Sequence, residues 1–313
     1  MKSAGELKVD HRRIWFVGVR TQGSAALSAF PGWMGVLRED IRLQGVDLPL
    51  DTDAPGYRNL LRRLRSCNNV VGAVITGHKA RLFESAGSEL DGLDRFARLC
   101  HEVSVVRRDG GQLVGCAVEP RSVKATLARM LEPGHWGATG GELLIFGAGG
   151  TAAALLACLY DSLTASRDAP GVVHLIDIDA ARAKALQESV LTWRTGVSVR
   201  VPHPSLVTET LLALPPSSLI VNATGLGKDQ PGSPVPLPAR WPNRAIVWEL
   251  NYRGQLPMLA DARAATRRQS LEVYDGWTLF IQGWSEALGT ILRHKLNAAE
   301  QGAFERIALS VRG

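Results

Sequence analysis

The sequence has few cysteines, no long apolar run and no strong excess of charge, and each shortage excludes a class of protein. Its cysteines are scattered, with no CxxC pair, at Cys67, Cys100, Cys116 and Cys158. This spacing predicts neither a disulfide framework nor a zinc site. No apolar run reaches the roughly 18 residues needed to cross a bilayer, and residues 1–13 are too polar for a signal peptide. We therefore expect a cytoplasmic protein with no metal and no membrane partner.

The charge is also modest, because 36 Lys and Arg residues against 30 Asp and Glu residues leave a net charge of +6. The densest basic run, Arg62-Arg63-Leu64-Arg65, falls in an amphipathic helical pattern that is typical of a solvated helix face. No basic stretch has the interleaved aromatic residues of a nucleic-acid groove. We therefore expect no nucleic-acid partner.

The length of 313 residues suits two domains of roughly 150 residues each. Strands are predicted in the first half over residues 14–18, 41–46, 72–76, 103–107 and 112–117, the last two joined at a hairpin turn over 109–111. Helices are predicted over 55–66, from 79 to about 99, after Pro120 and over 278–311. Pro133-Gly134 and Gly140-Gly141 mark a boundary, and strands and helices then alternate to about Tyr274. The pattern predicts two α/β lobes followed by C-terminal helices.

The most informative stretch runs from Leu143 to Ala154 and reads LLIFGAGGTAAA. It predicts a buried strand, a tight turn and the start of a helix, in which Gly147 permits the turn and Gly149 lets the backbone approach a ligand. Ala152 is small enough for the helix to pack on the strand. Free N–H groups and the helix dipole at such a turn favour a pyrophosphate. We predict a dinucleotide site here; the alternative is a strand–helix turn that binds nothing.

An acidic residue follows at the end of the next predicted strand, which ends in Leu175-Ile176-Asp177. It lies further after Gly147 than the usual gap of about 20 residues, and an intervening turn over Arg167–Gly171 accounts for the excess. A carboxylate there accepts hydrogen bonds from both ribose hydroxyls and repels a 2′-phosphate. Ile178 stands where an NADP site often has Arg, so we expect NAD rather than NADP. The alternative is that Asp177 or Asp179 only caps the next helix.

Several segments together resemble the shikimate/quinate dehydrogenase family, in order and over most of the chain. The glycine turn Phe146–Ala152 is similar to the family's GAGGA turn. The other matching segments are Val74–Lys79 (NVT-x-P-x-K loop), Gly115–Glu119 (G-x-N-T-D), Ile220–Gly227 with Pro234–Leu237 (VNAT-x-x-G…PL), Val247–Tyr252 (VxDxxY), and Asp275-Gly276 with Gln282-Gly283 (DG…Q).

This resemblance implies a substrate lobe over residues 1–120, completed by helices of 278–313, and a doubly wound Rossmann-type lobe over 121–277. It also implies a monomer or homodimer that acts on a small-molecule substrate. The implied cofactor contacts are Gly147, Ala148, Gly149, Gly150, Thr151, Ala152, Asp177, Asn222, Ala223, Thr224, Gly225, Leu250 and Gly276. The Asn222–Gly225 segment follows a predicted strand, where a nicotinamide ribose lies in a doubly wound fold; the alternative is an ordinary turn.

The resemblance also implies the chemistry, which is hydride transfer between nicotinamide and a ring hydroxyl. The hydroxyl proton must leave with the hydride, so a base has to contact that oxygen. The family uses a Lys and an Asp, and the matching positions are Lys79 and Glu119. Glu119 keeps the charge and adds one methylene, which suits a different substrate or weakens the activity. Without the resemblance, Lys79 would be interpreted as a surface lysine at a helix start.

The positions that would hold the substrate depart further from the family. The implied contacts are Thr21, Ser24, Thr76, Ser104, Tyr252 and Gln282. Ser24 fits the first serine of the family's SxS pattern, whereas Ala26 stands at the second, where Thr21 could compensate. Ala73 and Ser104 each replace an Asn, and Ala117 replaces the Asn before the acid. Each lost hydrogen-bond partner costs about 1–3 kcal/mol, so the best substrate is expected to differ from shikimate.

Two other classes of protein remain open. One is a regulatory protein that binds NAD or a ring acid without catalysis, because loss of substrate contacts with a retained glycine turn suits a sensor. The other is a different two-lobed NAD(P) enzyme, such as an amino-acid or methylene-tetrahydrofolate dehydrogenase. Substitution of Lys79 separates catalysis from sensing, and a substrate screen separates the two kinds of enzyme.

Overall fold

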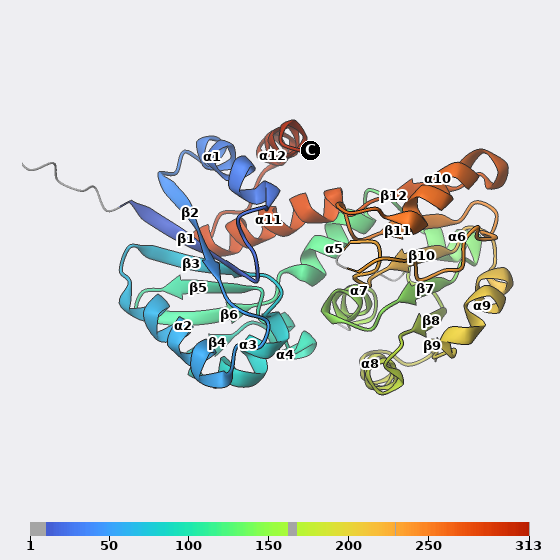
Figure 1. Cartoon of the computed structure of the whole chain (residues 1–313), viewed down its shortest axis with the longest axis horizontal. Coiled ribbons are helices and arrows are strands. Elements are labelled where there is room, and N and C mark those ends of the chain that lie inside the picture. The colour runs from blue at the N-terminus through green and yellow to red at the C-terminus, as the bar shows by residue number, and fades with distance from the viewer. Residues whose placement is uncertain (1–10, 162–167, 229, 313) are drawn as a thin grey trace, which may run out of the picture. The chain divides into compact units, whose positions relative to one another are not determined.

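The computed structural model describes residues 11–161, 168–228 and 230–312, which divide into two compact units. Unit 1 combines Met1–Val118 with Gly283–Gly313, and unit 2 comprises Glu119–Gln282. Each unit is built around one six-stranded sheet (Figure 1). The predicted alternation of strands and helices in both halves is therefore confirmed. The turn predicted over Arg167–Gly171 lies partly outside the described residues.

The sheet of unit 1 has the order β2-β1-β3-β5-β6-β4. Strands β2, β1 and β3 are parallel, whereas β5 runs antiparallel to β3 and forms a hairpin with β6 at the predicted turn. The strands are β1 Arg12–Gly18, β2 Ile41–Asp47, β3 Val70–Ile75, β4 Gly92–Leu93, β5 Val105–Asp109 and β6 Gln112–Cys116. The predicted helical region from 79 to 99 is interrupted by the short 3-10 turn η1 (Gly87–Glu89) and by β4.

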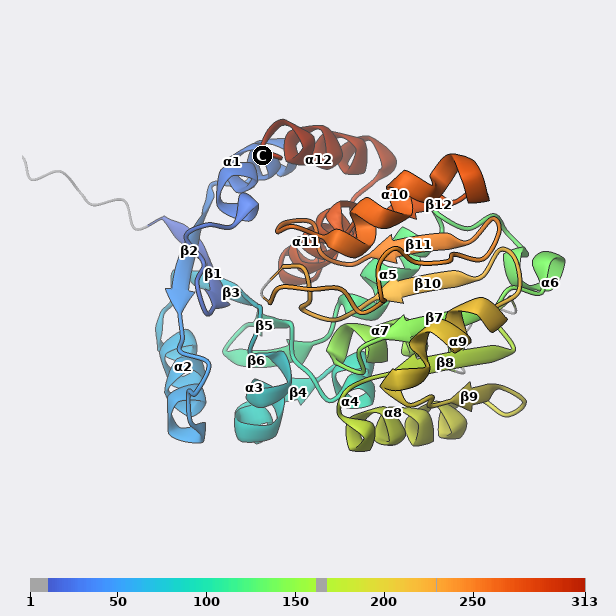
Figure 2. The same cartoon turned by 45° about the vertical axis from the view of Figure 1, so that its right-hand side comes forward.

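Helices cover both faces of this sheet. Helices α2, α3 and α4 share a buried apolar cluster with β1 and β3. Helix α1, near the N-terminus, and helix α12, near the C-terminus, lie side by side (Figure 2). Trp33 of α1 stacks on Phe304 of α12 with ring centroids 5.3 Å apart. The helices are α1 Ala25–Leu37, α2 Ala54–Ser66, α3 Lys79–Ala86, α4 Arg95–Cys100, α11 Trp277–Leu292 and α12 Ala298–Ser310.

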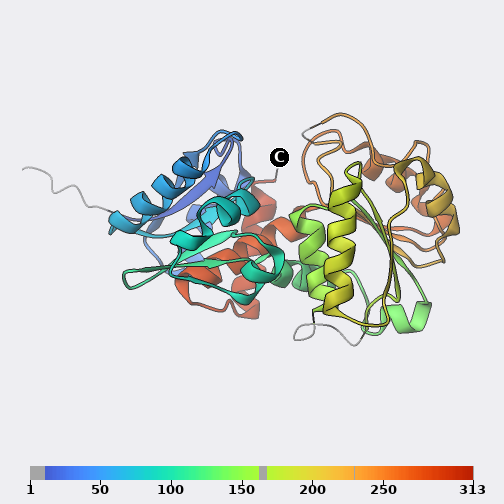
Figure 3. The same cartoon turned by 90° about the horizontal axis from the view of Figure 1, so that it is seen from below.

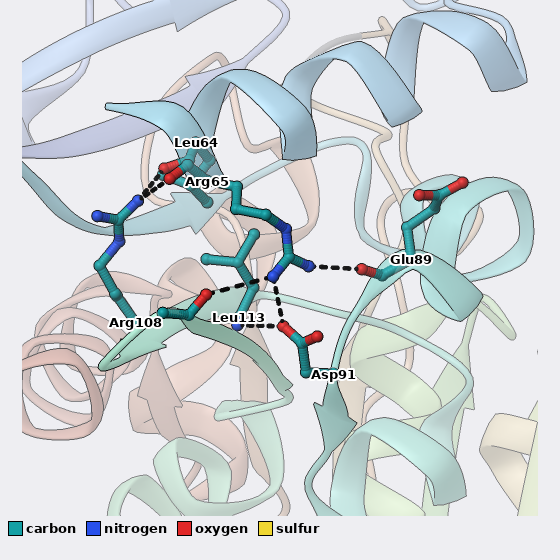
Figure 4. Close-up of polar contacts among 7 residues, drawn as sticks. Leu64, Arg65, Glu89, Asp91, Arg108 and Leu113 are labelled. Carbon is teal, nitrogen blue, oxygen red and sulfur yellow. Dashed lines mark hydrogen bonds and ion pairs between the residues drawn. The ribbon is translucent and has the colours of Figure 1, made fainter. Parts of the chain in front are cut away.

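The basic run of α2 is more than a solvated helix face. Arg65 donates to the Asp91 carboxylate at 2.8 Å and to the backbone carbonyls of Glu89 and Gly111 (Figure 4). Asp91 also accepts the Leu113 N–H, and these bonds hold the pKa of the Asp91 carboxyl below its usual value. The guanidinium thus ties the η1–β4 segment to α2 and to the β5–β6 hairpin. Arg62, Arg63 and Arg65 are all exposed, as the sequence predicts for a solvated face.

A buried histidine precedes α3. His78 is 1% exposed, with Nδ1 2.8 Å from the Tyr57 hydroxyl and Nε2 3.1 Å from the Leu48 carbonyl. A carbonyl can only accept, so the neutral ring carries its proton on Nε2 and accepts the Tyr57 O–H at Nδ1. Burial lowers the pKa of His78 below its ordinary value of 6.5, and the nearby Arg81 adds to this effect.

This histidine gives a pH-dependent stability. A base whose pKa is lower in the folded state resists protonation there, so below about pH 6.5 the unfolded chain binds more protons than the native chain. We expect the unfolding midpoint to fall as pH drops through this range. His78→Gln keeps one donor and one acceptor but does not titrate, and it should lose that part of the pH dependence. His203→Gln, at an exposed position, is the matched control, and thermal melts of all three proteins check the expectation.

The sheet of unit 2 is fully parallel, with the order β12-β11-β10-β7-β8-β9. In sequence terms this is the 3-2-1-4-5-6 order of a Rossmann fold, with its switch point between β7 and β10. The strands are β7 Leu143–Phe146, β8 Val172–Ile176, β9 Ser198–Arg200, β10 Leu219–Asn222, β11 Ile246–Glu249 and β12 Glu272–Tyr274. The predicted doubly wound fold is confirmed.

Helices cover both faces of this sheet as well (Figure 3), and an apolar cluster lies on each side. One cluster joins the sheet to α5, α7 and α8, and the other joins it to α9 and α10. The helices are α5 Glu119–Leu127, α6 His135–Thr139, α7 Gly150–Tyr160, α8 Ala180–Trp193, α9 Val207–Ala213 and α10 Pro257–Gln269, with the 3-10 turn η2 at Pro204–Leu206. Within the described ranges, none of the helices is both long and apolar enough to span a bilayer.

Candidate functional site

The predicted glycine turn joins β7 to α7 at the switch point of the unit 2 sheet. Gly147 has φ +93°, and a Cβ built on it would lie 3.0 Å from the Ala223 carbonyl oxygen. Gly149 is the N-cap of α7 in an extended conformation, and a Cβ there would meet nothing within 4 Å. The space beside Gly149, at the start of α7, is therefore open, and we call this space the glycine cradle. The first backbone amides of a helix have no partner within the helix and are available to a ligand there. This arrangement fits the pyrophosphate of a dinucleotide.

Asp177 lies at the end of β8 and supports the glycine turn. One carboxylate oxygen accepts the Ala148 N–H at 2.6 Å, and the other accepts the Asp179 N–H at 2.8 Å. Asp179, by contrast, caps α8 by accepting the Arg182 N–H. From the sequence, either Asp177 or Asp179 could have been the cap of the next helix. In the structure Asp179 is that cap, and Asp177 contacts the glycine turn. Each oxygen of a carboxylate can accept a second bond, so Asp177 keeps capacity for ribose hydroxyls.

The segment after β10 lies on the other side of the switch point. Asn222 is fully buried, and its Oδ1 accepts both the backbone N–H and the hydroxyl of Thr224. The Ala223 N–H donates to the Phe146 carbonyl at 2.8 Å, which binds this segment to the end of β7. The Leu226 N–H donates to the Thr224 hydroxyl oxygen. The predicted cofactor segments around Gly147 and Asn222 are therefore adjacent in the structure.

A buried carboxylate lies next to Asn222. Glu249, the last residue of β11, is 0% exposed and accepts three N–H groups, one from Asn222 and two from Asn251. Burial raises the pKa of Glu249, and these hydrogen bonds oppose that shift. Neither Glu249 nor Asn251 is among the site residues predicted from the sequence. The available signal was an Asn two residues after a buried strand, a position at which a polar side chain needs a partner.

The other unit 2 candidates follow β11 and β12. Tyr252 packs edge-on against Trp277 with centroids 5.1 Å apart, and burial raises the pKa of its hydroxyl. Gly276 donates its N–H to the Asn251 carbonyl, and a Cβ on Gly276 would lie 1.9 Å from the Leu250 carbonyl oxygen. Only glycine fits there. Gln282, on α11, is 5% exposed.

Four predicted substrate contacts lie in unit 1, and each hydroxyl has a partner there. Thr21 donates to Asp47 at 2.6 Å, and Thr76 donates to the Val17 carbonyl at 3.2 Å. Ser24 caps α1 by accepting the Ala26 N–H. The remaining one, Ser104, is 2% exposed and accepts the Val118 N–H at 3.0 Å. These hydroxyls therefore already serve the fold, and their contact with a substrate stays a prediction.

The two predicted catalytic residues each begin a helix. Lys79 is the first residue of α3 in unit 1, and Glu119 is the first residue of α5 in unit 2; both are partly buried. Two consecutive residues before β5 make hydrogen bonds within unit 1 to the backbone of Lys79 and of Val118. Val103 donates its N–H to the Lys79 carbonyl at 3.1 Å, while Ser104 binds Val118, the residue that precedes Glu119. The joint action of the pair stays a prediction.

The fold and the glycine turn define the class, which is a two-unit α/β protein with one Rossmann-type unit. No protein-family model matches the chain. It is similar, with 28% identity over 252 residues, to a protein named shikimate dehydrogenase (NADP+) from Salinibacter ruber, and the match covers 74% of this chain and 82% of that protein. The resemblance to the shikimate/quinate dehydrogenases that the sequence predicts is confirmed by this similarity.

Solved structures confirm the fold. A quinate dehydrogenase from Corynebacterium glutamicum, in complex with NAD, has a TM-score of 0.75 and 19% identity, covering 96% of this chain and 99% of its own. A ligand-free 5-ketofructose reductase of Gluconobacter sp. has a TM-score of 0.69 and 16% identity, covering 96% and 98%. The names differ in substrate, so the fold alone does not select one.

Proposed function

We propose that the protein is an NAD(P)-dependent oxidoreductase that transfers hydride between a nicotinamide and a hydroxyl or ketone of a cyclic hydroxy acid. The observation that carries this proposal is the open glycine cradle at the switch point, with Asp177 on one side and Asn222 on the other. The sequence similarity to shikimate dehydrogenases supports the reaction class. We also propose that it acts in the cytoplasm as a monomer or homodimer.

The residues that would hold the cofactor divide along its length. Gly147–Ala152 would receive the pyrophosphate, Asp177 the adenosine ribose, and Asn222–Gly225 with Leu250 and Gly276 the nicotinamide half. When bound, a nicotinamide supplies a hydride acceptor or donor. These segments belong to one unit and need no ligand to bring them together, which favours binding to a prepared site.

The proton has a separate route in this proposal. When the substrate C–H hydride leaves, the hydroxyl O–H proton passes to Lys79 as the carbonyl forms. Glu119 orients the ammonium that results and shares its proton. The sequence similarity to shikimate dehydrogenases supports this assignment of the pair. Residues 1–120, completed by the helices of 278–313, would supply the substrate lobe.

The substrate is proposed to be a ring acid other than shikimate. Thr21 and Ser104, which would hold the ring substituents, are 2% exposed and bonded within the fold. Fewer free donors face a polyhydroxy acid than the family pattern provides. The proposed contacts stay the six predicted ones, Thr21, Ser24, Thr76, Ser104, Tyr252 and Gln282.

The cofactor is proposed to be NAD. Asp177 would repel a 2′-phosphate, and Ile178 beside it is 96% exposed and offers no positive charge. The Salinibacter ruber relative is named for NADP+, and the quinate dehydrogenase structure holds NAD, so the comparisons include both cofactors.

The test is a screen of the purified protein for change in nicotinamide absorbance, with NAD and NADP, against shikimate, quinate and related cyclic hydroxy acids. We expect turnover with NAD, weaker turnover with NADP, and a ring acid other than shikimate as the best substrate. Family-typical efficiency on shikimate would contradict the substrate proposal. Absence of binding of both nucleotides in calorimetry would contradict the function itself.

A further inference from the structure

A buried polar cluster connects the ends of β10 and β11 at the carboxyl edge of the unit 2 sheet. We name it the Glu249 cluster, and it consists of Glu249, Asn222, Asn251 and Thr224. The Asn222 Nδ2 donates to one Glu249 oxygen at 2.6 Å, and the other oxygen accepts the Asn251 backbone N–H at 2.9 Å and its Nδ2 at 2.6 Å. All three donors are neutral amides, so the carboxylate form matches its surroundings.

The cluster fixes every polar group of Thr224. Its N–H and hydroxyl both donate to Asn222 Oδ1, and its carbonyl accepts the Asn251 Nδ2 at 3.0 Å. Glu249 also decides which way the Asn222 amide faces. Since the Asn222 Nδ2 donates to the Glu249 carboxylate, the Asn222 Oδ1 must face Thr224.

Asn251 is the residue that closes the cluster. Its side chain bridges Glu249 to the Thr224 carbonyl, and its own carbonyl accepts the Gly276 N–H at 3.1 Å. The side chain of Asn251 thus joins the segments after β10 and β11, and its backbone carbonyl adds the segment after β12. Asn251 is 9% exposed. A replacement without its side-chain amide would leave the Thr224 carbonyl and one Glu249 oxygen with one bond fewer, and water could not easily restore those bonds at a buried position.

We propose that Asn251 is a positioning residue that, anchored by the Glu249 carboxylate, holds the Asn222–Gly225 segment in the conformation that accepts the nicotinamide half of a dinucleotide. This inference rests on the proposed function. Asn251 acts through Thr224 rather than by contact with the reacting atoms. We expect the adenosine half to be affected less, because the Asp177 carboxylate is bonded to Ala148 and Asp179 rather than to the cluster.

The experiment compares nucleotide affinities by calorimetry on the full chain, using NAD+, NADP+ and ADP as probes. ADP carries the adenosine and diphosphate groups without nicotinamide. For Asn251→Leu we expect the affinity for the preferred dinucleotide to fall roughly 10-fold or more, as for loss of hydrogen bonds to a buried charge, while the affinity for ADP falls much less. Asn243→Leu, at an exposed position before β11, is the matched control and should change neither affinity.

A second variant keeps the test decisive if Asn251→Leu does not fold. Asn251→Ser retains a hydroxyl donor but is too short to bridge Glu249 and Thr224, so it should show the same selective loss. An unchanged ratio of dinucleotide to ADP affinity in the folded variants would overturn the inference. A wild-type chain that binds ADP but neither dinucleotide would overturn the proposed function instead.

Discussion

Lys79→Met is expected to reduce turnover by roughly 10²- to 10⁴-fold, the usual contribution of a positioned acid or base, while leaving dinucleotide affinity unchanged. The two effects separate because Lys79 lies on α3 of unit 1, whereas the proposed cofactor residues all lie in unit 2. Lys and Met have similar helix propensities, so α3 should form in the variant. Turnover with the best ring acid and calorimetry with NAD measure the two effects.

Lys184→Met is the matched control, because Lys184 is an exposed residue of α8, and it should retain full turnover. Undiminished turnover in Lys79→Met would remove this lysine from the mechanism. The regulatory alternative gives a third pattern, in which the wild-type chain binds nucleotide or ring acid but turns over none of the screened substrates. That pattern would leave the fold and the nucleotide site intact and discard the catalytic proposal.

The glycine turn was predictable because the residues that form it are consecutive in the sequence. The apolar run into Gly147, the open N-cap at Gly149 and the small Ala152 follow one another in sequence, and the structure places them as a strand, turn and helix. The parallel order of the sheet then follows from the alternation of strands and helices. What the sequence could not supply was the contact of Asp177 with the Ala148 N–H, which depends on the final register of β7 and β8.

Features that join segments distant in the sequence could not be predicted, because they depend on how the folded strands and helices lie side by side. Arg65 looked like part of a solvated face, and only the position of Asp91 shows its structural role. The Glu249 cluster requires β10 and β11 to end side by side, as the Asn222–Glu249 pairing shows. The hydroxyl of Thr21 was assigned from the resemblance, whereas its bond to Asp47 depends on the packing of the segment after β1 on the end of β2.

Gly149→Asp provides the sharpest test of the dinucleotide site, because it should affect the fold and the ligand in opposite ways. Gly149 has φ −82° and ψ −173°, an extended conformation that any residue adopts, and its Cβ would meet nothing within 4 Å. Asp is a better N-cap than Gly by a few tenths of a kcal/mol, although the nearby Asp177 carboxylate offsets part of this gain. Stability should therefore hold or rise slightly.

The same side chain should nearly abolish dinucleotide binding. Its carboxylate would occupy the cradle, bond the amides at the start of α7 and repel the pyrophosphate, and we expect an affinity loss of about 100-fold or more. Gly147→Ala is the contrasting variant, because φ +93° and a Cβ 3.0 Å from the Ala223 carbonyl oxygen should cost about 1–3 kcal/mol of stability. Chemical denaturation and calorimetry measure both quantities. If Gly149→Asp retained full affinity for NAD and NADP, the pyrophosphate would have to bind elsewhere, and an open helix start beside Gly149 would no longer indicate a cofactor.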